Sequence, residues 1–251
     1  LDWGSKHFKI PMGELQTKTL GSGKALESTL QSVVSGAKQA GFRQLMARAN
    51  PPEVQLIRAL ESVGFRLVDT LITLELSLKQ LAEPAKDSSI RQATHEDLPR
   101  LMEIAREAFS DQTVWLDRFH SDPNIPSKDA DQLYVEWIKN SVTPESPDQS
   151  MADATFVAES DGEVAGFLTC VLDSKQQTGK VSLNATSRAH RKKGIYGRLV
   201  SQALLWFKEQ EVHTVSVRTS VWSQPVQRTW IRFHALPTEI VHTFHYWIPS
   251  S

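Results

Sequence analysis

The chain has 251 residues, of which 40% are hydrophobic and 23% are charged, and its formal net charge is −1 at pH 7. These fractions are ordinary for globular proteins, so they exclude a disordered or fibrous chain. The near-neutral charge gives no overall attraction to nucleic acid or to an anionic membrane, so any anion site has to be local. The sequence also lacks a run of about eighteen apolar residues, which excludes a membrane-spanning helix.

The one cysteine of the sequence, Cys170, cannot form an internal disulfide. This fits a reducing compartment, and we expect a cytoplasmic location. The apolar residues around Cys170 predict that it lies in the core, because a catalytic thiol would need a cationic partner nearby.

The predicted elements fall into two unequal pieces. Residues 1–80 form the first piece, and the proline and polar residues of 81–89 indicate a linker. The second piece, residues 90–251, is long enough for one complete domain.

The second piece opens with a short strand at Ile90 and a helix-start signal, Thr94-His95-Glu96-Asp97. The apolar spacing that follows predicts a helix that ends near Phe109. Four prolines lie in the region 110–149, around a predicted helix over 128–141. An insertion of this length often shapes a binding site.

Strands dominate the middle of this piece and alternate with helices at its end. The turn signal Asp161-Gly162 predicts a hairpin between two β-rich runs. In chain order we expect strands over 154–159, 164–172 and 180–186, a helix from Ile195, a strand over 215–219, a helix over 224–233, and a strand to Trp247. This order predicts an α/β or α+β fold.

The first eighty residues resemble a second copy of the chain's end. In the repeat register, the gapless alignment that places Ala25 on Ile195, apolar positions fall on apolar positions. Among the matched pairs are Leu30 on Val200, Leu45 on Val215, and Leu60 on Trp230. The match is one of pattern rather than identity. It predicts a front piece with a helix, strand, helix, strand order and without a basic turn, which would make it a structural partner and not a second active site.

The most informative segment is 180–199, where a strand leads into a cationic turn, a glycine and an amphipathic helix. Free N–H groups and the positive end of the helix dipole favour an anion at the start of a helix, and glycine allows the anion close to the backbone. The turn adds the cations Arg188, Arg191, Lys192 and Lys193. The segment therefore predicts a diphosphate site, with a solvated basic turn as the alternative. One short basic turn without interleaved aromatic residues argues against nucleic-acid binding.

Arg191-Lys192-Lys193-Gly194-Ile195-Tyr196 resembles the coenzyme A signature of the GCN5-related N-acetyltransferases (GNAT), which is Arg or Gln, two residues, Gly, one residue, then Gly or Ala. The chain departs from the signature at Tyr196, and Gly197 follows one place later. The resemblance implies the GNAT acetyltransferase fold, a mixed central sheet flanked by helices, over about residues 88–247. Residues 1–80 would be a degenerate half-GNAT domain.

The resemblance also implies acetyl-coenzyme A as cosubstrate, no metal, and a strand whose backbone pairs with the pantetheine arm. The cofactor-binding residues that it implies are Leu183, Asn184, Ala185, Thr186, Arg191, Lys192, Lys193, Gly194, Ile195, Tyr196, Gly197 and Arg198.

A closer pattern resemblance is to the TDP-fucosamine acetyltransferase group, which acetylates a nucleotide-linked amino sugar. It rests on residues 1–8, on Arg118-Phe119-His120-Ser121-Asp122 with the later 133–138, and on residues 64–69. It makes an amino sugar the leading acceptor and Arg118, Phe119 and Asp122 the candidate substrate-binding residues. The alternatives are another small amine or a peptide as acceptor, and a catalytically silent coenzyme A-binding module. A homodimer is left open.

Acetyl transfer is helped by a general acid for the departing thiolate, and the family commonly uses a tyrosine for this step. The resemblance places Trp230 at that tyrosine's position, and an indole N–H cannot supply a proton. Tyr196, Tyr246 and His234 are the remaining candidates, each with a packing or capping role as the alternative. His242 and His245 lie three apart on a predicted strand, a spacing that does not suit a shared metal ion.

Overall fold

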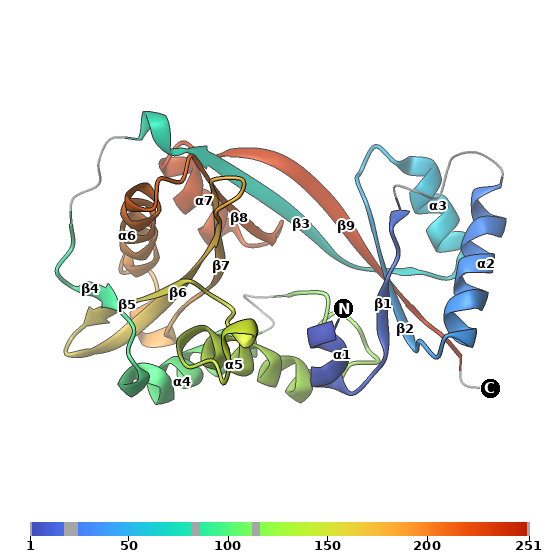
Figure 1. Cartoon of the computed structure of the whole chain (residues 1–251), viewed down its shortest axis with the longest axis horizontal. Coiled ribbons are helices and arrows are strands. Elements are labelled where there is room, and N and C mark those ends of the chain that lie inside the picture. The colour runs from blue at the N-terminus through green and yellow to red at the C-terminus, as the bar shows by residue number, and fades with distance from the viewer. Residues whose placement is uncertain (1, 18–24, 82–85, 112–115, 250–251) are drawn as a thin grey trace. The chain divides into compact units, whose positions relative to one another are not determined.

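The computed structural model describes residues 2–17, 25–81, 86–111 and 116–249 (Figure 1). The chain divides into two compact units. Unit 1 consists of residues 1–72, 116–129 and 239–251, and unit 2 consists of residues 73–115 and 130–238. Two strands and one helix have residues in both units: β3 (Arg66–Ser77), β9 (Leu236–Trp247) and α5 (Ser127–Val142).

Unit 1 packs two helices against a small mixed sheet whose strand order is β1-β2-β9-β3. Strand β1 runs parallel to β2, and β2 runs antiparallel to β9. Apart from β3 and β9, its elements are α1 (Asp2–Phe8), β1 (Met12–Glu14), α2 (Leu26–Gln39), β2 (Gln44–Ala49) and α3 (Val54–Val63). Its core joins Leu30 of α2 and Leu60 of α3, both fully buried, to Phe244 of β9.

Unit 2 is built on a mixed sheet whose strand order is β9-β3-β8-β7-β6-β5-β4. Its strands are β4 (Ile90–Gln92), β5 (Ala154–Ser160), β6 (Glu163–Asp173), β7 (Thr178–Thr186) and β8 (Thr214–Ser220). Strands β4 to β7 pair antiparallel and β7 pairs parallel with β8. Its helices are α4 (Leu98–Phe109), most of α5, α6 (Ile195–Glu209) and α7 (Gln224–Arg232). Figure 1 shows α6 on one face of this sheet and α4 and α5 on the other.

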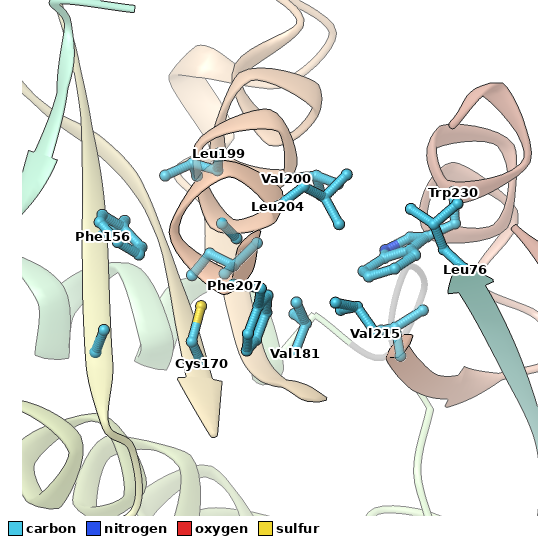
Figure 2. Close-up of a cluster of buried hydrophobic side chains, with 14 of the residues drawn as sticks. Leu76, Phe156, Cys170, Val181, Leu199, Val200, Leu204, Phe207, Val215 and Trp230 are labelled. Carbon is cyan, nitrogen blue, oxygen red and sulfur yellow. The ribbon is translucent and has the colours of Figure 1, made fainter. Parts of the chain in front are cut away.

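The core of unit 2 lies between α6, α7 and the sheet. Figure 2 shows Phe207 of α6, Cys170 of β6 and Trp230 of α7 among aliphatic side chains, and all three are fully buried. Helix α6 approaches β7 closely, because a Cβ atom at Gly179 would lie 2.4 Å from the Phe207 ring. Burial also raises the pKa of the Cys170 thiol, so Cys170 is a core residue, as predicted, and no nucleophile.

Most of the elements predicted in the second piece are confirmed. The hairpin between β5 and β6 turns at Asp161 (φ 56°) and Gly162 (φ 83°), and Thr94 and Asp97 form the expected capping box before α4. The part of the chain that the structure describes contains no helix that is both long enough and apolar enough to cross a membrane.

The element bounds follow the repeat register. In this register the first residues of β2, α3 and β3 fall on the first residues of β8, α7 and β9, and α2 begins one position later than α6. The compact units do not follow chain order, however, because unit 1 includes 116–129 and 239–251. The division into 1–80, a linker at 81–89 and 90–251 stays a prediction, and residues 82–85 of that linker lie outside the described part.

Candidate functional site

Strand β7 loses its partner on one side where the predicted pantetheine strand begins. Its parallel pairing with β8 covers Thr178 to Val181, while its pairing with β6 continues to Thr186. The Leu183 backbone N–H and C=O face β6, since both bond the Thr169 hydroxyl, at 2.8 and 3.1 Å. Because backbone groups alternate in direction along a strand, those of Asn184 and Thr186 face the side that β8 has left. This half of β7 can pair with an extended ligand.

The predicted diphosphate turn follows directly, as a short 3-10 helix over Arg188–His190 and a loop to Gly194. Asp111 holds two of its cations, with an oxygen 3.2 Å from both the Arg188 and the Arg191 guanidinium groups. Lys193 pairs with Asp161 at 3.4 Å. Arg188, Arg191 and Lys193 each lie near a carboxylate, and they cluster over one short turn.

The start of α6 is open to a ligand. Gly194 caps the helix in the left-handed conformation (φ 76°), and the first bond of the helix runs from the Arg198 N–H to the Gly194 carbonyl at 3.2 Å. The N–H groups of residues 195–197 therefore have no acceptor within the helix. A Cβ atom added at Gly194 or Gly197 would meet nothing within 4 Å, so there is room above these groups. Lys192, also left-handed (φ 64°), adds a turn conformation whose N–H groups suit an anion.

Tyr196 and Trp230 come together. The Trp230 indole N–H donates a hydrogen bond to the Tyr196 hydroxyl, with 2.9 Å between Nε1 and Oη. Trp230 is fully buried, whereas Tyr196 is partly exposed. The hydroxyl end of Tyr196 is buried, and burial raises its pKa, so the hydroxyl is protonated at neutral pH and is a weaker acid than a free tyrosine. Tyr196 departs from the family signature, yet its hydroxyl lies against the residue at the family tyrosine's position.

The other catalytic candidates have packing or capping contacts. Tyr246 belongs to unit 1, where its ring packs on Phe65 with 5.1 Å between centroids. His234 ends α7 in the left-handed conformation (φ 65°), which is a capping position. Arg198, predicted to bind the cofactor, bonds the Ser89 hydroxyl at 2.7 Å and so holds residues that precede β4.

The predicted substrate-binding residues lie in unit 1. Arg118 and Phe119 line a pocket of about 240 Å³, whose lining includes Gln44 and His245. The Arg118 guanidinium stacks on the Phe119 ring at 4.4 Å from its centroid. Asp122 is buried and is 2.7 Å from both His245 Nδ1 and Trp247 Nε1. The pairing of Asp122 with His245 was missed by sequence reasoning, because 123 residues separate them and no motif joins them.

The Asp122 and His245 pair has a defined charge state. Burial opposes ionisation of Asp122, but hydrogen bonds from His245, Trp247 and Asn124 outweigh it and lower the pKa of Asp122. Burial lowers the pKa of His245 more than Asp122 raises it. A neutral imidazole therefore donates its Nδ1–H to a carboxylate. Within the described residues, no group of three His, Cys, Asp or Glu is placed to hold a metal ion.

The comparisons with known proteins show the family and the fold of the chain. Residues 100–234 match the model of the Acetyltransferase (GNAT) family, which covers more than half of the chain. No curated protein matches the chain in sequence. The chain is therefore a mixed α/β acyltransferase, and it belongs to the GNAT family, whose members transfer acetyl groups from acetyl-coenzyme A.

Solved structures share the fold over most of the chain. A GCN5-related N-acetyltransferase from Sphaerobacter thermophilus has a TM-score of 0.59 at 15% identity, covering 91% of this chain and 70% of its own. One from Kribbella flavida has a TM-score of 0.55 at 15% identity, with coverages of 90% and 76%. A tandem GNAT protein from the clavulanic acid biosynthesis pathway has a TM-score of 0.58 at 12% identity, with coverages of 96% and 77%. At these identities the likeness concerns the fold.

Proposed function

We propose that the chain is an N-acetyltransferase that moves an acetyl group from acetyl-coenzyme A to a primary amine, with the cosubstrate bound at β7 and the start of α6. One observation carries the proposal: the edge of β7 that loses β8 after Val181 leads without interruption into the cationic turn and the uncapped N–H groups of α6. An extended arm with a diphosphate at its end needs these two features in this order.

The residues present fit this cosubstrate. Within residues 183–186, the backbone groups of Asn184 and Thr186 would pair with the pantetheine arm, and the N–H groups of residues 195–197 would receive the diphosphate, over the open space above Gly194. Arg191, Lys192 and Lys193 would offset its negative charge. The Tyr196 ring does not fill this space, because its hydroxyl lies against Trp230.

Acetyl transfer then requires little more than positioning. The unprotonated amine attacks the thioester carbonyl, a C–N bond forms, the C–S bond breaks, and the thiolate takes up a proton while the nitrogen loses one. We assign Tyr196 as the donor that assists the departing sulfur, because its hydroxyl is protonated and is oriented by Trp230. Trp230 is a positioning residue in this assignment, and Tyr246 is a packing residue.

The identity of the amine that accepts the acetyl group is a more specific proposal. The resemblance to the TDP-fucosamine acetyltransferase group favours a nucleotide-linked amino sugar, and the cation and aromatic ring at Arg118 and Phe119 suit a sugar phosphate. Another small amine or a peptide is the second candidate acceptor.

The tandem GNAT protein among the similar folds supports the predicted half-GNAT repeat, since it covers 96% of this chain. The repeat, the cytoplasmic location, the homodimer and the lack of a metal stay predictions.

Release of free thiol from acetyl-coenzyme A, followed with a panel of amines, tests the function. The panel contains nucleotide-linked amino sugars, free amino sugars, amino acids and short peptides. We expect turnover with one class and an N-acetyl product by mass spectrometry. Binding of acetyl-coenzyme A without turnover of any amine would replace the proposal with a silent coenzyme A-binding module.

A further inference from the structure

The pocket of unit 1 contains a buried acceptor without a partner. Gln44 begins β2, is 1% exposed and lines this pocket, yet its side-chain oxygen Oε1 has no hydrogen-bond partner within the described residues. Leaving a buried amide oxygen unpaired costs free energy, so such atoms in folded proteins commonly indicate a ligand or a water molecule.

His245 offers a second acceptor on the same lining. Its Nδ1–H is committed to Asp122 at 2.7 Å, and Asp122 is itself held by Trp247 and Asn124. Since the imidazole is neutral, its Nε2 carries a lone pair and accepts a hydrogen bond. A ligand of this pocket therefore needs N–H or O–H groups that donate hydrogen bonds to Gln44 Oε1 and His245 Nε2.

The other residues that line the pocket indicate the charge and the apolar part of its ligand. Arg118 places a positive charge on the pocket, which also lowers the pKa of His245. A ligand that carried only an ammonium group would meet repulsion from Arg118, and a simple carboxylate would leave both acceptors unpaired. Trp3, Met12 and Met46 provide apolar surface, which suits an apolar body.

We propose that this pocket binds a small zwitterion, a free α-amino acid with an apolar side chain, with its ammonium group on Gln44 Oε1 and His245 Nε2 and its carboxylate on Arg118. The volume of about 240 Å³ suits a molecule of this size rather than a nucleotide sugar. The binding site stands by itself.

Calorimetric titration of the full chain with L-leucine and L-phenylalanine tests the proposal. For leucine the matched probes are 3-methylbutylamine, which lacks the carboxylate, and 4-methylpentanoate, which lacks the amine. We expect at least one amino acid to bind with sub-millimolar affinity and both truncated probes to bind at least tenfold more weakly. Three results would refute an amino acid as the ligand class. They are absence of binding by both amino acids, equal binding of a truncated probe, and tight binding of D-glucosamine instead.

Two variants locate the site. Gln44→Leu removes the unpaired oxygen, and we expect at least tenfold weaker amino acid binding with no loss of Tm. Gly4→Val places methyl groups in the pocket, since a Cβ atom at Gly4 is 3.5 Å from the Met12 sulfur, and we expect loss of binding. Gly36→Val, on the exposed side of α2, is the matched control. Full amino acid affinity in both pocket variants would refute the location.

A third variant separates this proposal from the proposed function. Arg191→Ala/Lys192→Ala, in unit 2, is expected to lose acetyl-coenzyme A binding and to keep the amino acid affinity unchanged. Amino acid binding without any acetyl-coenzyme A binding would leave the pocket proposal standing and remove the acetyl-transfer function. Acetyl-coenzyme A binding without any amino acid binding would remove the pocket proposal and leave the acetyl-transfer function standing.

Discussion

Helix α2 and helix α6 match in the repeat register, and each opens a helix, strand, helix, strand order, yet they begin differently. The N-cap of α6 is the left-handed Gly194 and its first turn has no acidic residue, whereas the N-cap of α2 is Ala25 (φ −79°) and its first turn contains Glu27. Residues 188–193 carry four cations, and the matching residues 18–23 carry only Lys18. These charges favour an anion more strongly at the start of α6 than at the start of α2, which has Lys24 before it and Glu27 in its first turn.

The same comparison explains Trp230. Its counterpart in the repeat register is Leu60, and the counterpart of Tyr196 is Leu26. Leu26 and Leu60 share the apolar core of unit 1, while Tyr196 and Trp230 share a hydrogen bond in unit 2. Burial at position 230 therefore has a counterpart at Leu60, whereas the hydroxyl at position 196 has no counterpart at Leu26.

The largest effect is expected from Tyr196→Phe, which removes the hydroxyl that bonds Trp230. We expect kcat to fall by about 100-fold to 1,000-fold, as is typical of a lost proton donor, with the Kd for acetyl-coenzyme A changed less than about twofold. The measurement is thiol release under saturating cosubstrate, with Kd from calorimetry.

Trp230→Tyr offers a sharper form of this test, because it restores a tyrosine at the family's position. In the Tyr196→Phe background it should recover part of kcat. A Tyr196→Phe enzyme with undiminished kcat would remove Tyr196 from the mechanism.

Asp122→Ala is expected to destabilise the chain by about 2–3 kcal/mol, because the buried His245 and Trp247 donors would lose a charged acceptor. Chemical denaturation followed by tryptophan fluorescence measures this. Asp148→Ala, at an exposed carboxylate, is the control. A loss no larger than that of an ordinary surface substitution, about 0.5 kcal/mol, would show that the pair contributes little.

The same pair predicts acid sensitivity. Because the pKa of His245 is lower in the folded chain, the unfolded chain takes up a proton first, so stability is full above about pH 6.5 and falls as the pH drops toward the folded value. The lowered pKa of Asp122 adds a further loss below about pH 4. His245→Gln should flatten the profile between pH 7 and 5, and an unchanged profile would contradict the assignment.

The smallest effect concerns the ends of α3 and α7, where Gly64 (φ 107°) and His234 (φ 65°) match in the repeat register. His234→Gly should stabilise the chain by about 0.5–1 kcal/mol, because glycine adopts this conformation without strain. Gly64→Ala should destabilise it by about 1 kcal/mol. Thermal unfolding measures both, and a destabilised His234→Gly would indicate that the imidazole makes a stabilising contact of its own.

The elements, including those of the segment that we propose binds coenzyme A, could be predicted because their signals are local. The run from Lys180 to Leu199 contains strand, turn, glycine and helix in one short segment, and the hairpin at Asp161-Gly162 has its own turn chemistry. The Tyr196 to Trp230 hydrogen bond and the Asp122 to His245 pair could not be predicted, since 34 and 123 residues separate the partners. The periodicity of apolar residues predicts which face of an element is buried. It does not predict which side chains of other elements contact that face.

Calorimetric titration of acetyl-coenzyme A tests the central claim most directly, with Gly194→Asp and Arg191→Ala/Lys192→Ala as site variants. Gly41→Asp has the same left-handed strain in open space (φ 84°), and Lys208→Ala removes a cation from the other end of α6, so both are matched controls. We predict micromolar binding by the wild type and both controls, and at least 100-fold weaker binding by the site variants. No binding by the folded wild type, or binding that the site variants leave intact, would contradict the assignment of the start of α6 as the coenzyme site.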